Sequence, residues 1–504
     1  MKVADRPRAG GVPAAADETS PRQQSLVLAV LLLGVSIAAV DTTIVVLGLP
    51  VMMADLHADI VSMVWVIMAY LLVLTMLSTQ VGRFGDMFGR VRMYQLGFVV
   101  FTAGSLLCGL AASGPQLIAF RVLQGVGGAL LTANSGAIVA DNVPRARRGR
   151  AYGIIGIGWS IGAVLGILLG GVLITFINWR YIFFINVPIG IVALAIGYRV
   201  LRDRSARTVQ RIDWVGMVFL GGGLYLILLA LTNMTGAGWT AATGVEIATG
   251  VVLIGAFAAW ERAAAAPMLD LTLFQYRVLT ASVFAALFQA LGSFAVMFLV
   301  IMYLQGVRGL SPFYASLLLV PGYLIGAVLG PWAGRIADRR GSRLPVALGL
   351  AVQAVGVLLY TTLVVDSPLW FVVVASVVNG AGNAFFFPSN NSAVVAHTPA
   401  RAFGVANGLL RTLSNIGMVG SFAVALLMAA SAIPRQAAFA IFLGVSRLTP
   451  ALAGAFVKGM HAALLASISL IAIALALSLL QGRAPAPATG DREGRWEPAP
   501  GGEG

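Results

Sequence analysis

The chain has 504 residues, of which 59% are hydrophobic and only 10% are charged, and its formal net charge is +14. Soluble domains contain about 25% charged residues, so this composition excludes a soluble globular protein and indicates an integral membrane protein. Apolar runs of about 20 residues, long enough to cross a bilayer as helices, recur along nearly the whole chain. The alternating strands of about ten residues that form a membrane β-barrel do not occur.

Fourteen membrane-crossing helices are predicted, and they cover residues 26–49, 61–80, 93–112, 117–140, 150–173, 181–200, 214–232, 243–261, 280–304, 313–333, 345–364, 369–390, 403–429 and 459–480. An even number places both chain ends on one side, and most of the 33 basic residues lie in the loops of that side. The exceptions are Arg180, Arg308, Arg435, Arg447 and Lys458 in the opposite loops, and Arg121 and Arg411 inside helices. Basic loops remain cytoplasmic, so a multi-pass protein of the plasma (inner) membrane with both termini in the cytoplasm is expected.

This distribution of charge also excludes a nucleic-acid partner, because the arginines are spread over every inner loop and form no single binding face. Residues 1–25 and 481–504 are rich in Pro, Gly, Ala and charge, and are expected to be disordered cytoplasmic tails. The single cysteine, Cys108, excludes an intrachain disulfide framework. With three histidines and no nucleotide-binding loop of the Walker type, no metal site, no cofactor and no enzymatic activity are expected.

A short polar segment occurs twice, as VGRFGDMFGRVRMY (81–94) and GPWAGRIADRRGSR (330–343). Its glycines and charged residues align pairwise, Gly82 with Gly334, Arg83 with Arg335, Asp86 with Asp338 and Gly89 with Gly341. Further pairs are QGVGGA (124–129) with NGAGNA (379–384), and RAYG (150–153) with RAFG (401–404). The chain is therefore interpreted as a duplication of six-helix halves, 26–200 and 280–480, joined by a linker with two inserted helices, 201–279.

Two six-helix repeats with this polar segment after the second helix resemble the major facilitator superfamily. Three motifs resemble its fourteen-helix drug:proton antiporters more specifically: AVDTTIVVLGLP (39–50), RVLQGVGGA (121–129) and NWRYIFFINVPIG (178–190). The resemblance covers residues 26–480 and implies an all-α membrane protein with the major facilitator fold. It also implies proton-coupled efflux of hydrophobic or cationic small molecules, as in drug or antibiotic export, by a monomer in the lipid bilayer that works by alternating access. A proton-coupled metabolite importer of the same superfamily is the alternative.

Asp41 and Arg121 are the candidate proton-coupling residues. A charge within a membrane helix costs about 2.5–3.5 kcal/mol on insertion scales, so a carboxylate deep in the first helix indicates function. Arg121 lies at similar depth in the fourth helix, and the two side chains are expected to meet on the wall of a central cavity. A static buried ion pair is the alternative. The second half has Ser376 where the first has Arg121, and a charge present in only one half favours chemistry.

The polar segments are predicted to be a conformational latch, comprising Gly82, Arg83, Asp86, Gly89, Arg90 and Asp338. In the resembling family this carboxylate contacts the N-terminal end of a helix in the opposite half, where the helix dipole favours an anion by about 0.3–1 kcal/mol. That helix is expected to start near Phe403 for Asp86 and near Arg150 for Asp338. The contacts are expected to close the cytoplasmic side in the outward-facing state and to break in the inward-facing state. The alternative is that the segments only determine topology.

The fifth helix carries glycines at four-residue spacing, which places them on one face for close contact with another helix. This packing motif comprises Gly158, Gly162, Gly166, Gly170 and Gly171, and it resembles the antiporter motif of the family except that Ile167 stands where proline is usual. Generic packing of small residues is the alternative interpretation.

The substrate is expected to contact Tyr70, Trp159, Gln289, Asn379 and Asn383. Aromatic faces attract cations, and asparagine side chains can bind a ligand, although they also bridge neighbouring helices. Asp41 is expected to be the only carboxylate facing the cavity, with Glu246 near the outer end of the eighth helix as the other candidate. Because a second positive charge would then have no partner, dications are expected to be poor substrates.

Overall fold

A computed structural model describes residues 21–143, 145–203, 211–264, 266–269, 271–398, 403–432 and 450–480. These ranges contain helices and no strands, and fourteen of the helices are long and apolar enough to cross a membrane. The prediction of an all-α protein with fourteen membrane-crossing helices is confirmed. The expected tails beyond residues 21 and 480, and the outer-loop residues Arg435 and Arg447, lie outside the described ranges.

The first half consists of helices α1 (Pro21–Asp55), α2 (Ile60–Phe88), α3 (Arg90–Gly109), α4 (Gly114–Asn142), α5 (Arg145–Phe176), α6 (Tyr181–Phe184) and α7 (Asn186–Val200). The inserted helices are α8 (Trp214–Ala237) and α9 (Ala241–Ala263). The second half consists of η1 (Leu271–Gln275), α10 (Arg277–Met302), η2 (Tyr303–Val307), α11 (Pro312–Arg340), α12 (Arg343–Tyr360), α13 (Leu369–Ala396), α14 (Phe403–Ser431) and α16 (Pro450–Leu479).

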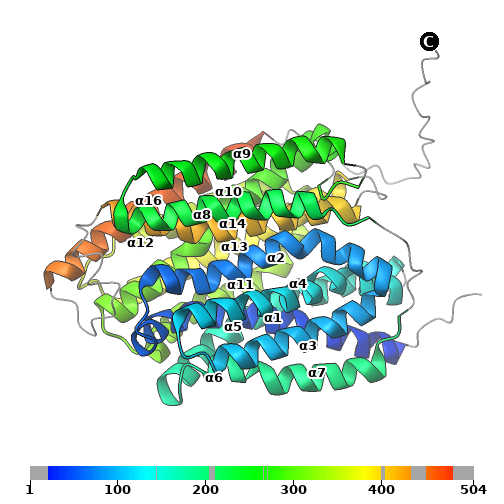
Figure 1. Ribbon diagram of the computed structural model, residues 1–504, viewed down its shortest axis with the longest axis horizontal. Helices are drawn as coiled ribbons and strands as arrows, with labels where there is room; N and C mark the ends of the chain where they lie inside the picture. The colour runs from blue at the N-terminus through cyan, green and yellow to red at the C-terminus, as the bar shows by residue number, and fades with distance from the viewer. Residues whose placement is uncertain are drawn as a thin grey trace, which may run out of the picture.

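The two halves repeat one packing scheme (Figure 1). In the first half α1 packs on α5, and α4 packs on α2 and α3; in the second half α10 packs on α14, and α13 packs on α11 and α12. The halves meet where α5 contacts α11 and where α2 contacts α14. The inserted helix α8 contacts both α2 and α14, so the α8–α9 hairpin lies against both halves.

The polar segments are largely helical, although the predicted spans left residues 81–92 and 334–344 outside any helix. Helix α2 continues to Phe88 and α11 continues to Arg340, because charged side chains are compatible with helix once it leaves the apolar core. The chain turns only at Gly89 and Gly341, whose φ angles are 103° and 89°. Residues with a Cβ rarely adopt such φ angles, which explains why a glycine stands at both turns.

Other helix boundaries also differ from the prediction. Helix α1 begins at Pro21, so residues 21–25 belong to a helix and not to the tail. The predicted sixth span, by contrast, coincides with the membrane-crossing stretch Tyr181–Val200, in which Ile185 joins α6 to α7 with helical backbone angles. The NWRYIFFINVPIG motif begins just before this span: the Trp179 indole N–H and the Arg180 guanidinium both donate to Asp55 at the end of α1, at 2.9 and 2.6 Å.

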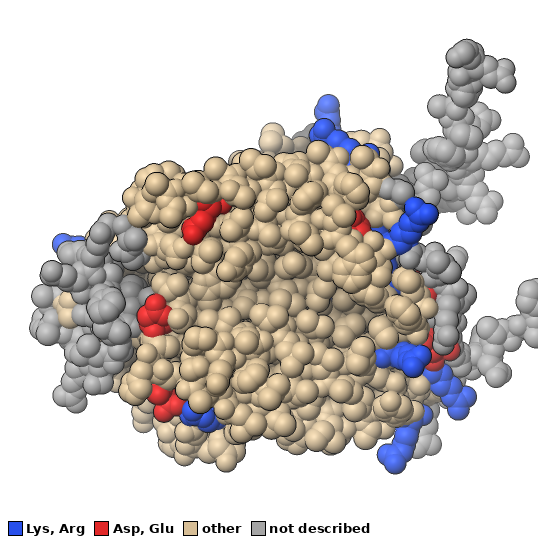
Figure 2. Space-filling model, viewed as in Figure 1, with Lys and Arg blue, Asp and Glu red and all other residues tan. Residues whose placement is uncertain are grey.

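The surface is divided into an apolar band and a basic end. On the face drawn in Figure 2, the broad central area carries almost no charged side chains and blue side chains gather at the right. We call the end at which α2 and α11 finish the basic end; Arg83, Arg90, Arg339, Arg340 and Arg343 lie there. The apolar band fits the hydrocarbon region of a bilayer.

Candidate functional site

A large cavity lies between the two halves and is open at the basic end. Its volume is about 3060 Å³, larger than the 300–1,000 Å³ or so of an ordinary ligand pocket, because it includes the wide mouth between the halves. Helices α1, α2, α4 and α5 form one wall, and α10, α11, α12, α13 and α14 form the other. Asp86, Arg90, Asp338 and Arg340 line the mouth.

The two halves close the cavity at its opposite end. The Gln305 amide donates to the carbonyl oxygen of Leu47 at 3.0 Å, and the Phe313 N–H donates to the Thr175 hydroxyl at 3.0 Å. The rings of Phe176 and Phe313 stack edge to face with their centroids 5.3 Å apart. Each of these contacts joins a residue of the first half to a residue of the second.

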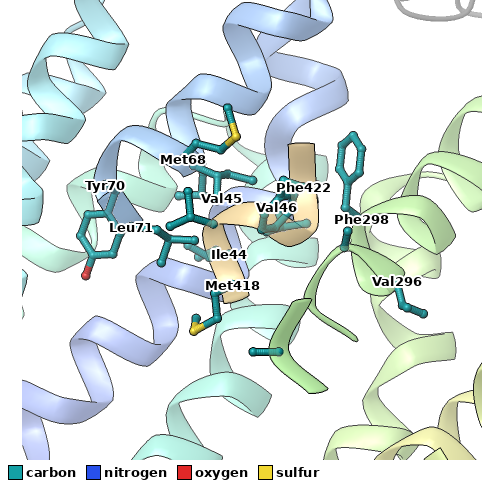
Figure 3. Close-up of a cluster of buried hydrophobic side chains, with 14 of the residues drawn as sticks. Ile44, Val45, Val46, Met68, Tyr70, Leu71, Val296, Phe298, Met418 and Phe422 are labelled. Carbon is teal, nitrogen blue, oxygen red and sulfur yellow. The ribbon is translucent and has the colours of Figure 1, made fainter. Parts of the chain in front are cut away.

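The inner part of the cavity is apolar. Val46 of α1, Val296 of α10 and Met418 and Phe422 of α14 line it. Figure 3 shows these side chains in one cluster where helices of the two halves converge. The cavity therefore offers apolar contacts deep inside and polar contacts nearer the mouth.

Asp41 and Arg121 meet within the first half. The Arg121 Nη1 donates to Asp41 Oδ2 at 2.6 Å and to Gln124 Oε1 at 2.7 Å, and Gln124 Nε2 donates to Asp41 Oδ1 at 2.8 Å. Arg121 Nε also donates to the carbonyl oxygen of Val66 at 3.0 Å. Both charged groups thus have hydrogen-bond partners, which a buried ion pair requires. The sequence analysis missed Gln124, although it lies in the repeated QGVGGA motif.

The expectation that this pair lines the cavity is wrong. Asp41 and Arg121 are 0% and 1% exposed, and neither belongs to the cavity wall. Tyr70, predicted to contact substrate, is 1% exposed; its ring lies 4.2 Å from the Arg121 guanidinium and covers it. A small side recess of the cavity reaches Tyr70, so this ring separates the ion pair from the cavity.

The two latch carboxylates, Asp86 and Asp338, each have a partner within their own half in this structure. Arg90 donates to Asp86 at 2.8 Å and to Asp141 at 2.6 Å, so the Asp86 carboxylate has a partner within its own half. Asp338 accepts from the Ser392 hydroxyl at 2.8 Å, again within one half. The expected partner helices begin at Phe403, as predicted, and at Arg145 rather than near Arg150.

In this conformation Arg83 and Gly82 make no contact with a helix of the opposite half among the described residues. The Arg83 guanidinium lies at the edge of the cavity and donates to the carbonyl oxygens of Arg211, Ala266 and Pro267, which flank the inserted helices. Gly82 lines the open cavity and has no neighbouring element within 4 Å of the place of a Cβ, so it makes no close helix contact here.

The glycines of α5 pack against α1. A Cβ on Gly162 would lie 2.6 Å from the carbonyl oxygen of Ser36, and one on Gly166 would lie 2.8 Å from that of Val40. Gly158 and Gly170 face Leu32 and Ile44 of the same helix. Gly171 instead faces Ser316 of α11, at the closed end of the cavity. Ile167 is fully buried.

An uncharged amide cluster occupies the second half. Gln289 of α10 donates to Gln353 of α12 at 3.1 Å and to Asn383 of α13 at 3.4 Å. All three side chains line the cavity, as do Asn379 and Trp159, which is 38% exposed. Of the predicted substrate contacts, only Tyr70 lies off the main cavity. Glu246 also lies away from it, where it accepts from Asn233 of α8 at 3.3 Å.

Arg411 is a cavity residue that the sequence analysis counted among the basic residues inside helices but did not weigh. It lies on α14, is exposed to the cavity, and also lines the recess that reaches Tyr70. The signal was the same as for Arg121, a charge within an apolar helix. Helical spacing alone does not say which face of α14 meets the cavity.

The fold and the cavity define a two-half membrane transporter, and the family comparison agrees. The family model of the Major Facilitator Superfamily matches residues 31–422 and 282–500. The chain belongs to the Major Facilitator Superfamily.

Three relatives have about the same degree of identity to this chain. The tetracenomycin C resistance and export protein of Streptomyces glaucescens is 31% identical over 408 residues, 79% of this chain and 74% of that protein. Multidrug resistance protein 3 of Bacillus subtilis is 31% identical over 411 residues, 80% of this chain and 79% of that protein. The riboflavin transporter RibZ of Clostridioides difficile is 30% identical over 396 residues, 78% of this chain and 86% of that protein.

Two solved structures share the fold. One is a bacterial homolog to the human lysosomal transporter Spinster in an inward-facing, unoccupied conformation, with a TM-score of 0.66, 18% identity and coverage of 92% of this chain and 97% of that one. The other is the xylose transporter XylE of Escherichia coli in a partially occluded inward-open conformation, with a TM-score of 0.58, 13% identity and coverage of 88% and 96%.

Proposed function

We propose that this protein exports hydrophobic small molecules in exchange for protons, by alternating access between its two halves. The observation that carries the proposal is the cavity between repeated halves, open at one end and closed by contacts between the halves at the other. Two of the relatives bear names of export or drug resistance, which supports the direction.

The basic end is assigned to the cytoplasm, because loops rich in Lys and Arg remain on that side. The conformation described above is then inward-facing, ready to take up substrate from the cytoplasm or from the inner leaflet. Transport requires a second conformation in which the contacts of Gln305 and Phe313 break and the basic end closes.

Asp41 is the proposed proton-coupling group. Its carboxylate is buried within a membrane helix and pairs with Arg121, so a conformational change that separates the two would expose a group able to take up a proton. The inward-facing arrangement holds the carboxylate in contact with Arg121 and Gln124. Protonation from outside would weaken these contacts in the outward-facing state and allow the return step.

Neutral hydrophobic substrates fit the cavity better than cations do. Among the described residues of its wall, Asp86 and Asp338 are the carboxylates, and both lie at the mouth. A cation deep inside would have no carboxylate beside it, because Asp41 is sealed behind Tyr70. The poor transport expected of dications therefore extends to monocations with a fixed charge.

A metabolite importer is the second candidate, favoured by the polar side of the cavity. Gln289, Gln353 and Asn383 form a hydrogen-bonded cluster of the kind that binds a polar solute, and one relative is named as a riboflavin transporter. The direction of transport separates the two candidates.

Transport by whole cells tests the proposal. Cells that express the chain are loaded with a panel of dyes and drugs, and efflux is followed with and without a protonophore. We expect faster efflux of neutral amphiphiles than in cells expressing Asp41→Asn, and loss of the difference when the protonophore is added. Greater accumulation than in the control cells would identify an importer.

A further inference from the structure

Arg411 differs from Arg121, the other arginine inside a membrane helix, in having no counter-charge among the residues that the structure describes. Arg121 contacts a carboxylate, an amide and a carbonyl. Among the residues that the structure describes, no hydrogen bond or ion pair joins Arg411 to another side chain, and the carboxylates of the cavity wall lie at its mouth. A charged residue within a membrane helix that faces an open cavity is rare and is a functional candidate by default.

The position of Arg411 is within reach of a transported molecule. It lies six residues into the span Val405–Ser431, about 9 Å along the helix from the basic end. Its side chain is exposed to the cavity, and the recess beside it is walled by Trp159 of α5 on the other half. A molecule bound there would contact both halves.

The face of α14 around Arg411 is polar on one side and apolar on the other. Asn407 lies one turn before it and Asn415 one turn after it, and both line the cavity. Further along the same face come Met418 and Phe422, which belong to the apolar cluster of Figure 3. The helix thus presents, in order from the mouth, an amide, a guanidinium, a second amide and an apolar surface.

We propose that Arg411 binds an anionic group of the transported molecule, a carboxylate or an ionised phenol, while the apolar body of that molecule lies against Met418, Phe422 and Trp159. The inference rests on the proposed function in that it takes the central cavity as the substrate path. A guanidinium suits this task because it stays charged and pairs with a carboxylate through two parallel hydrogen bonds. The substrate class is thereby narrowed to amphiphiles that carry a negative group, or a strong acceptor, at one end.

Binding to the purified protein tests this without requiring transport. The probes share one scaffold: biphenyl-4-acetate, its neutral amide, and the matching trimethylammonium cation. Affinities are measured by calorimetry on the full chain in nanodiscs of zwitterionic lipid, at neutral pH. We expect the acid to bind at least about tenfold more tightly than the amide, because hydrogen bonds between two charged groups are stronger than those to a neutral amide. The cation should bind least.

Three variants separate a local contact from a general effect of charge. Arg411→Gln should bind the acid and the amide equally, whereas Arg411→Lys should keep a preference for the acid. Arg277→Gln removes the same charge from an exposed position at the start of α10, outside the cavity, and should retain the full preference. Monodisperse elution of each variant confirms that it is folded.

Two results would overturn the inference. One is equal binding, or no binding, of acid and amide by the unmodified protein. The other is an equal loss of the preference for the acid in Arg411→Gln and Arg277→Gln. That result would show that the net positive charge of the protein attracts the acid, and that Arg411 does not contact it. A protein that shows the acid preference yet fails to export in cells would instead contradict the proposed direction and coupling, so the two failures are distinguishable.

Discussion

The Asp41–Arg121 pair can be tested as a switch against its alternative, a static ion pair. Both side chains are buried and hydrogen-bonded, so the geometry of one conformation is compatible with either role. The two roles differ in what happens when both charges are removed together. Replacing a whole buried pair is often neutral or stabilising, whereas removing one partner is strongly destabilising.

We therefore predict that a variant lacking both charges regains stability but not transport. Asp41→Asn leaves the Arg121 charge unpaired and should lower stability by about 3–5 kcal/mol, together with loss of proton-driven efflux. Asp41→Asn combined with Arg121→Leu should regain most of the thermal stability and remain inactive. The measurements are the midpoint of thermal unfolding and pH-gradient-driven transport in proteoliposomes. Recovery of transport along with stability would support the static pair.

Single residues were predictable from the sequence in their chemistry but not in their orientation. A charge inside an apolar run singles out Asp41, Arg121 and Arg411, because insertion is costly for each. Whether such a side chain points into the cavity or into the interior of its own half depends on how its helix is rotated about its axis. The spacing of apolar residues does not determine this rotation. Asp41 is sealed and Arg411 is exposed for this reason.

At the scale of helices, the glycines of α5 set its distance from α1. We predict that Gly162→Ala destabilises the protein by roughly 1–3 kcal/mol, because its Cβ would lie 2.6 Å from the Ser36 carbonyl oxygen and the helices would have to separate. Gly156→Ala is the matched control on the same helix: a Cβ there meets no neighbouring element within 4 Å. Since alanine favours helix over glycine, the control should be unchanged or slightly more stable. Equal midpoints of thermal unfolding would contradict close packing at Gly162.

Helices were predictable in number and approximate position, and less so at their ends. The length and hydropathy of the apolar runs suffice to predict the number of helices. A segment that crosses a membrane must satisfy its backbone hydrogen bonds internally, so each long apolar run forms a helix. The ends depend on where the chain can turn, and α2 and α11 run through charged residues to Gly89 and Gly341. Charge at the boundary of the bilayer marks the end of the span, not the end of the helix.

At the scale of the whole molecule, the repeated segments predicted that the chain has two similar halves. They did not predict which end of the cavity between the halves is open. The sequence is common to every state, and the structure is open at the basic end. In this state Asp86 already has Arg90 as a partner, so a latch contact with the other half would have to compete with that ion pair. The latch remains a prediction for the state that is closed at the basic end.

A disulfide across the closed end should trap the open-cavity conformation. The background is Cys108→Ala, which removes the single cysteine of the chain. Thr175→Cys and Phe313→Cys are introduced together, because the Phe313 N–H lies 3.0 Å from the Thr175 hydroxyl. Oxidation should stop transport and a reductant should restore it, while each single cysteine variant transports under both conditions. Full transport by the cross-linked protein would rule out an alternating opening at this end.

The central claim, exchange of substrate for protons, is tested most directly by the sign of a pH change. Purified protein is reconstituted in liposomes that contain a pH-sensitive dye, with equal pH on both sides, and a substrate identified by the efflux panel is added outside. Exchange drives protons out as substrate enters, whichever way the protein is oriented, so we predict that the lumen becomes more alkaline, and that Asp41→Asn abolishes the change. Acidification of the lumen would show that substrate and protons move together and would contradict the account.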